Sequence, residues 1–136
     1  IILKTVKKFS EKSTILESIL PLYRDEAEDK KFVKDLLTKV VDGDKENSQM
    51  ISDKTKNWDV ERIAMVDVLL MKMALTEFIH FKSVPVKVTL NEYIELSKWY
   101  SSPKSKVFVN GVLDKIVEDL KSKGVLKKMG RGLLEN

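Results

Sequence analysis

Residues 107–120 read VFVNGVLDKIVEDL, and their apolar side chains recur at the spacing of one face of an α-helix. The positions that share this face are Val107, Phe108, Val109, Val112, Leu113, Ile116, Val117 and Leu120. Lys121 falls in the expected last turn and Gly124 just beyond it, an arrangement typical of a helix end. Ser102 and Pro103 are typical of a helix start, so the sequence predicts a helix between these two boundaries.

Asn110 and Gly111 lie inside this helical pattern. In isolation, Asn-Gly is a strong signal for a hairpin turn, but helical spacing continues on both sides of it. Glycine within a helix costs about 1 kcal/mol relative to alanine. We therefore expect another helix backbone to approach closely at Gly111, and Asn110 to bond to neighbouring backbone groups.

Apolar spacing predicts further helices before this one. Their expected ranges are 14–23, 29–41, 47–55, 59 to about 80–83, and a helix that follows Pro85. The helix capped by Asp59 is apolar around most of its circumference, so we expect it to be the longest and to be central. Pro85 fits the first turn of the next helix. Thr89 and Glu92 have capping-box spacing, however, and would place that start later.

The chain as a whole shows no alternating strand pattern, and proline and glycine are sparse. We therefore predict an all-α fold, a compact helical bundle of about five to seven helices. With 136 residues, the chain is expected to form a single helical domain over residues 1–136. It begins at Ile1 rather than Met, which is compatible with a fragment of a longer protein.

Signatures of catalysis are absent from the sequence. There is no cysteine and one histidine, which excludes cysteine chemistry and a histidine-based metal cluster. Gly130 and Gly132 lie in a basic tail rather than in a phosphate-binding loop between a strand and a helix. His80 is expected at a helix end, in a capping or surface role. We expect a binding protein that is not an enzyme and uses no cofactor, metal or small-molecule substrate.

The net charge of +4 is carried almost entirely by lysine. Two groups stand out, Lys4, Lys7, Lys8 and Lys12 near the start, and Lys121, Lys123, Lys127, Lys128 and Arg131 near the end. Each group is either a solvated terminus or a phosphate-contacting surface. No apolar stretch has membrane-spanning length and no signal peptide is visible, so we expect a cytoplasmic protein without a membrane partner.

Polar residues at three apolar helix positions need partners. Asp67 is an acid on the long apolar helix, and its candidate partners are Lys72, Arg62 or another molecule. Asn91 and Glu92 are expected to cap the helix after Pro85 and to form hydrogen bonds between helices.

Three segments then match one family in order and in spacing. They read MKMALTE at 71–77, VPVKVTLNEYIELSK at 84–98, and FVNGVLDKI at 108–116, the last preceded by Ser105. They closely resemble the NusB family of bacterial transcription antitermination factors. The resemblance is specific from about Asp59 to Ile116 and weaker over residues 32–55. Its motif residues, which we assign mainly to the fold, are Glu77, Pro85, Asn91, Glu92, Phe108, Asn110, Gly111 and Asp114.

The resemblance implies an all-helical fold of two packed subdomains. It also implies binding of the boxA segment of ribosomal RNA leaders together with the ribosomal protein NusE. The pair joins the elongating RNA polymerase complex and suppresses termination. Lys72 stands where the family usually has arginine, so it is a candidate for RNA binding. Asp67 stands at a usually acidic position near the partner-facing surface.

The sequence also departs from the family elsewhere. NusB proteins typically begin with an arginine-rich helix that contacts RNA, whereas Lys4, Lys7 and Lys8 are the basic residues present here. Either these lysines bind RNA, or the arginine-rich helix lies upstream of Ile1. Lys104 stands where an acid is common.

Two other functions remain open at this point. A NusB-like domain is also fused to certain ribosomal-RNA cytosine methyltransferases, although the 16 residues after Leu120 show no methyltransferase sequence. The other alternative is a protein-interaction module without RNA binding.

Overall fold

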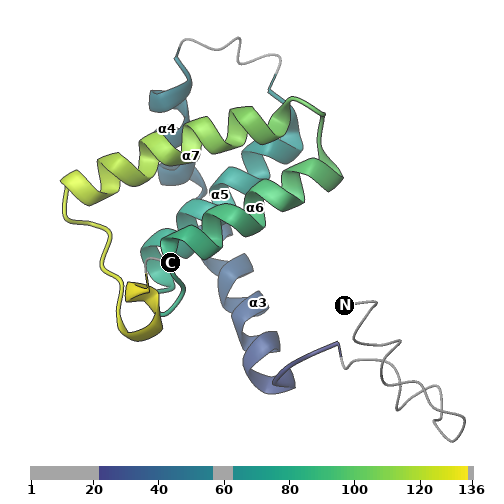
Figure 1. The fold of residues 1–136 in the computed structure, drawn as a ribbon, viewed down its shortest axis with the longest axis vertical. Coiled ribbons are helices and arrows are strands. Elements are labelled where there is room, and N and C mark those ends of the chain that lie inside the picture. Colours follow the sequence, from purple (N-terminus) through teal and green to yellow (C-terminus); the bar gives the residue numbers. More distant parts are fainter. Residues whose placement is uncertain (1–21, 57–62, 135–136) are drawn as a thin grey trace, which may run out of the picture. The chain divides into compact units, whose positions relative to one another are not determined.

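The computed structural model describes residues 22–56 and 63–134 of the chain. These residues form α-helices and one short 3-10 helix and no strand, which confirms the predicted all-α fold (Figure 1). The elements are α3 (Glu26–Asp42), α4 (Asp44–Thr55), α5 (Met65–His80), α6 (Val86–Tyr100), α7 (Ser105–Ser122) and η2 (Gly130–Leu133). The helix predicted over 14–23 falls almost wholly outside the described residues.

The chain divides within α3 into two units, residues 1–33 and residues 34–136. Helix α3 begins three residues earlier than predicted because Asp25 caps it. One carboxylate oxygen of Asp25 accepts the N–H groups of Ala27 and Glu28, both at 3.1 Å. Helix α4 likewise begins at Asp44 rather than Asn47, directly after a turn at Gly43.

Helix α5 is central to the second unit, as its all-round apolar sequence predicted, and it packs against α4, α6 and α7. Its Met71, Ala74, Leu75 and Phe78 are completely buried. Burying a side chain such as Phe78 contributes about 1.5–3 kcal/mol to folding. The prediction that this helix is the longest is wrong, because extended backbone at Ala64 delays its start to Met65. Among the described helices, α7 is longer, with 18 residues against 16.

Helix α7 buries the face that its spacing predicted, apart from Val107, which is exposed. The expected start at Ser102 and Pro103 is early by about two residues. The backbone turns first, with the Ser105 N–H donating to the Ser102 carbonyl at 2.9 Å, and α7 begins at Ser105. At its other end, Gly124 adopts a φ of 65°. That conformation ends the helix as the sequence predicted.

The prediction of a close helix crossing at Gly111 is wrong. Nothing lies within 4 Å of the position where its Cβ would stand, and the residue is exposed. Asn110 does not bridge to backbone groups either, because its amide donates to the Asp114 carboxylate at 2.8 Å, one turn further along α7. The helix therefore tolerates this glycine without any packing contact that requires it.

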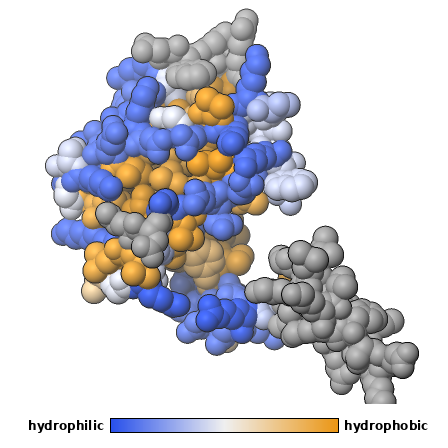
Figure 2. All heavy atoms as spheres, viewed as in Figure 1, coloured by the Kyte–Doolittle hydropathy of each residue, from blue (hydrophilic) through white to orange (hydrophobic). Residues whose placement is uncertain are grey.

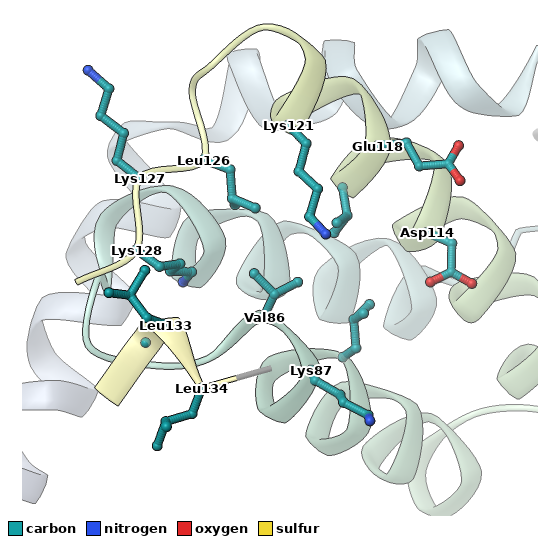
Figure 3. Close-up of a pocket in the computed structure, with 13 residues that line it drawn as sticks. Val86, Lys87, Asp114, Glu118, Lys121, Leu126, Lys127, Lys128, Leu133 and Leu134 are labelled. Atoms are coloured by element: carbon teal, nitrogen blue, oxygen red, sulfur yellow. The ribbon is translucent and has the colours of Figure 1, made fainter. Parts of the chain in front are cut away.

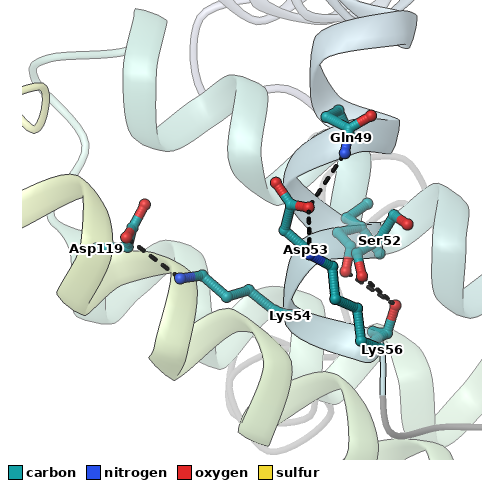
Figure 4. Close-up of polar contacts among 8 residues, drawn as sticks. Gln49, Ser52, Asp53, Lys54, Lys56 and Asp119 are labelled. Carbon is teal, nitrogen blue, oxygen red and sulfur yellow. Dashed lines mark hydrogen bonds and ion pairs between the residues drawn. The ribbon is translucent and has the colours of Figure 1, made fainter.

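Helices α4 and α7 are joined by an ion pair at their surface. Lys54 on α4 lies 3.2 Å from the Asp119 carboxylate on α7, and Figure 4 shows this side chain reaching across. Asp119 also pairs with Lys123 at 2.7 Å. The hydrogen bonds from Lys123 and Lys54 hold the pKa of Asp119 below its usual value. The pair adds a specific contact at the edge of the bundle rather than a large stabilisation.

Residues after α7 fold back onto the turn between α5 and α6. The Met129 N–H donates to the Lys82 carbonyl at 2.9 Å. Lys128 donates to the carbonyls of Phe81 at 3.0 Å and Glu77 at 3.3 Å where α5 ends, in addition to the backbone N–H groups of Val84 and Phe81 that these carbonyls accept. Gly132 packs so closely that a Cβ there would lie 2.0 Å from the Lys82 carbonyl oxygen. This segment, residues 125–134, is called the C-terminal strap below.

Candidate functional site

The predicted RNA-binding residues fall into two groups. Lys4, Lys7 and Lys8 lie outside the described residues. Lys72 lies on α5, and its ammonium is 2.5 Å from a carboxylate oxygen of Asp44 on α4. The Lys72 side chain is 16% exposed and that of Asp44 is 63% exposed. A cation with one exposed carboxylate as its partner can exchange that partner for a phosphate group.

Asp67, the predicted partner-binding residue, is buried in the first turn of α5 with 3% of its surface exposed. Its Oδ2 accepts a hydrogen bond of 2.7 Å from the Ser105 hydroxyl at the start of α7. Its Oδ1 is buried and has no partner among the described residues. Lys72, one expected partner, pairs with Asp44 instead, and Arg62 lies outside the described residues. The geometry places Asp67 beneath the surface, where it joins two helix starts.

The structure also reveals a cluster of three serines beside Asp67, which the sequence did not predict. Ser105 Oγ lies 2.9 Å from Ser101 Oγ and 2.8 Å from Ser102 Oγ. Together with Asp67 these hydroxyls connect the end of α6 to the starts of α5 and α7. The available signal was the run of serines around Pro103, since serine is common at helix boundaries.

Glu77 is buried and joins α5 to α6. One carboxylate oxygen accepts the Thr89 hydroxyl at 2.6 Å and the other accepts the Tyr93 hydroxyl at 3.1 Å. Burial, followed by the charge and hydrogen bond of Glu77, raises the pKa of Tyr93. Pro85 occupies the capping position of α6, whose first residue is Val86. Thr89 is therefore inside the helix, and the later start considered from its capping-box spacing is wrong.

Asn91 and Glu92 are exposed on α6 and neither cap it nor bond to another helix within the described residues. That expectation is wrong because the cap lies further back, at Pro85.

The structure does bring two of the motif residues together. Asn91 and Asn110 line a shallow groove of about 440 Å³ between α6 and α7, along with Lys98 and Lys106. Phe108, by contrast, is buried in the core.

Large apolar side chains are exposed where α5 and α7 begin and α6 ends. They are Met65, Leu69, Trp99, Tyr100 and Val107. Trp99 is 81% exposed, which is unusual for the residue type. Exposed aromatic side chains of this kind are enriched at protein interfaces. Apolar spacing did not reveal this group, and it placed Val107 on the same stripe as the buried residues of α7.

The described residues contain no group of three His, Cys, Asp or Glu side chains placed to hold a metal ion. His80 lies at the end of α5, where burial and then the charge of Lys39 lower its pKa. None of the described helices is long and apolar enough to cross a membrane.

Comparison with known proteins agrees with the motifs. The sequence model of the NusB family matches residues 1–118, well beyond the segment in which the motifs alone are recognisable. The chain is 41% identical over 106 residues to the transcription antitermination protein NusB of Chloroherpeton thalassium, covering 78% of this chain and 50% of that one. It is 47% identical over 89 residues to the protein of the same name from Salinibacter ruber, covering 65% and 56%.

A third relative, the transcription antitermination protein NusB of Geobacter sulfurreducens, is 35% identical over 111 residues, covering 78% of this chain and 80% of that one. The solved structure of T. maritima NusB superposes with a TM-score of 0.65 at 30% identity, covering 77% and 73% of the two chains. The chain thus spans about half the length of the first two relatives and more of the other two. The family match over most of the sequence shows that the chain belongs to the NusB family.

Proposed function

We propose that this chain is an RNA- and protein-binding factor of bacterial transcription antitermination. It binds boxA-type RNA of ribosomal RNA operons together with NusE, and the pair joins the RNA polymerase elongation complex in the cytoplasm. The observation that carries the proposal is the family match over residues 1–118, alongside relatives that are themselves named transcription antitermination proteins. Its role is binding rather than catalysis.

The ion pair between Lys72 and Asp44 supports an RNA contact by exchange. The Asp44 carboxylate holds the Lys72 ammonium at 2.5 Å while the RNA is absent. A phosphate group that takes the place of Asp44 gives Lys72 an equivalent charge-assisted hydrogen bond. Because Asp44 is exposed, water solvates the carboxylate that is released, and the exchange costs little. Lys4, Lys7 and Lys8 would add further phosphate contacts.

The exposed apolar group around Trp99 supports binding of a protein partner. Its members belong to the same three helices, α5, α6 and α7, whose ends the serine cluster and Asp67 connect. In this proposal Asp67 acts indirectly: it fixes the helix starts that present Trp99 and Val107 to NusE. Helix ends that are already fixed in the free protein lower the entropy lost on binding.

A salt-dependent RNA titration tests the proposal. We expect a boxA-type RNA to bind at least about tenfold more tightly than its scrambled sequence when NusE is present. Replacing Lys72 by Gln should reduce the slope of log affinity against log salt by about 0.7, the value for one phosphate contact on a single strand. The matched control is Lys115→Gln, an exposed lysine on α7.

Equal binding of both RNAs in the presence of NusE would contradict the RNA part of the proposal. If NusE itself still bound under those conditions, the chain would be a protein-interaction module without RNA specificity.

A further inference from the structure

A groove of about 770 Å³ lies between α6, the second half of α7 and the C-terminal strap (Figure 3). Its apolar lining comes from all three elements. Val86 and Leu90 belong to α6, Val117 to α7, and Leu126 and Leu133 to the strap. Figure 2 shows hydrophobic atoms gathered on the face that carries α6 and α7, with hydrophilic side chains around them.

The wall formed by the strap is fixed in place. Lys128 is tied to two carbonyls at the end of α5, and the Met129 N–H is bonded to the Lys82 carbonyl. The close approach of Gly132 to the Lys82 carbonyl leaves no room for the backbone to shift inward. The groove is therefore preformed, as binding sites usually are.

The charges around the groove are mostly positive. The side chains of Lys87, Lys121 and Lys127 line it, and none of the three makes an ion pair or hydrogen bond with another described side chain. Lys128 lines it too, although its ammonium is occupied by backbone carbonyls and burial lowers its pKa. The lining also includes two acids, Asp114 and Glu118, both on α7.

The positions of these charges matter more than their number. In Figure 3 the Lys121 side chain directs its ammonium into the hollow, beside Leu126 and above Val86. The Glu118 and Asp114 carboxylates lie together along α7, to one side of it. An incoming carboxylate would thus meet Lys121 among aliphatic side chains, and the acids leave one end of the groove negative.

The lining favours a peptide over RNA. Single-stranded RNA is usually held by aromatic side chains on which bases stack, and no aromatic residue of the described chain lines this groove. The exposed Trp99 and Tyr100 lie at the end of α6, whereas the residues of α6 that line the groove lie near its start. Aliphatic walls with lysines at their edge match a segment that alternates leucine-like anchors with acidic residues.

We propose that this groove binds an acidic peptide segment of a partner protein. Aliphatic side chains of the segment insert between Val86, Leu126 and Leu133, and a Glu or Asp beside them pairs with Lys121. The residues that line the groove include neither Lys72 nor the exposed apolar group around Trp99, and the proposal does not depend on the function proposed above.

The test uses a fluorescein-labelled amphipathic peptide of Glu and Leu, titrated with the full chain and followed by anisotropy and by amide chemical shifts. We expect saturable binding that shifts the amides of Lys121, Leu126 and Leu133. Lys121→Glu should weaken it at least about tenfold, since it places a like charge opposite the ligand. Leu133→Asp, at an exposed wall position, should do the same without disturbing the core.

Lys115→Glu is the matched control, because Lys115 is an exposed lysine on the same helix that does not line the groove. It should leave peptide affinity unchanged, and a peptide with Gln in place of Glu should bind weakly. Equal affinity for the Glu and Gln peptides, or equal loss in the Lys115 and Lys121 variants, would overturn the proposal. So would oligouridine that shifts these same amides more strongly than the peptide. The Lys121→Glu variant should bind boxA RNA and NusE as the unaltered chain does. That result would show that the loss of peptide binding is independent of the function proposed above.

Discussion

The ammonium of Lys72, in the middle of α5, lies 2.5 Å from Oδ1 of Asp44, the first residue of α4. The two residues are 28 positions apart in the sequence, so this ion pair forms only when the helices pack. Lys72, which we propose to bind RNA, is therefore paired with an acid in the free protein. RNA and Asp44 then compete for the same cation.

Replacing Asp44 by Asn should strengthen RNA binding if Lys72 contacts phosphate. Removal of the competing carboxylate should raise affinity about two- to fivefold at low salt, as expected for an exposed ion pair of up to about 1 kcal/mol. The measurement is an anisotropy titration with boxA-type RNA. In the double variant with Lys72→Gln the gain should vanish. A gain that persists without Lys72 would assign the effect to general charge rather than to this pair.

Ser105→Ala should destabilise the fold by about 1–3 kcal/mol. The change removes the hydrogen bond to Asp67 and leaves a second buried carboxylate oxygen without a partner. Urea denaturation measures the loss, and Ser52→Ala, at an exposed site on α4, should change stability by less than about 0.5 kcal/mol. A double-mutant cycle with Asp67→Ala should show coupling between the two sites. Additive effects would mean that the bond contributes nothing specific.

The contact between Tyr93 and Glu77 should make stability depend on alkaline pH. The pKa of Tyr93 is raised above 10.0 in the folded state, so the unfolded chain loses the phenol proton first. The stabilisation linked to this group is complete below about pH 10, and it declines as pH rises from there toward the folded-state pKa. The difference in unfolding free energy between wild type and Tyr93→Phe, measured from about pH 8 to about pH 11, isolates this contribution. An increase of this free-energy difference with rising pH would contradict the prediction.

Gly111→Ala should stabilise the protein by about 0.5–1 kcal/mol. The position is exposed inside α7 and has open space where a Cβ would stand, so alanine adds helix propensity without a clash. Thermal unfolding measures the change. Gly132→Ala is the contrasting variant, because its Cβ would meet the Lys82 carbonyl, and it should lower stability. A destabilised Gly111 variant would show that the site faces a contact absent from this structure.

Helical spacing predicted the helices well because periodicity reports which side of a helix is buried. It placed Leu113 and Phe78 in the core and located Gly124 as the end of α7. Helix starts were less predictable, since they depend on local backbone geometry. Extended backbone at Ala64 starts α5 late, and the cap at Asp25 starts α3 early.

The candidate site was predicted less completely, because its residues are defined by partners far along the chain. Periodicity carries no information that Asp67 meets Ser105, or that Asp44 reaches Lys72. Gly111 shows the opposite failure. A glycine within a helix predicted close packing, but the structure has open space where a Cβ of residue 111 would stand. Family motifs identified the fold, whereas the C-terminal strap and its groove could be recognised only from the structure.

Lys128 completes the end of a helix that lies far before it in the chain. Its bonds to the carbonyls of Glu77 and Phe81 span 51 and 47 residues. During synthesis, these two bonds cannot form until residue 128 has left the ribosome. Contacts of such sequence separation slow folding, since the loop must close before the bonds can form. The contacts that Lys128 adds at the end of the central helix therefore form only after α6 and α7 have been made, because both helices lie between α5 and Lys128 in the sequence.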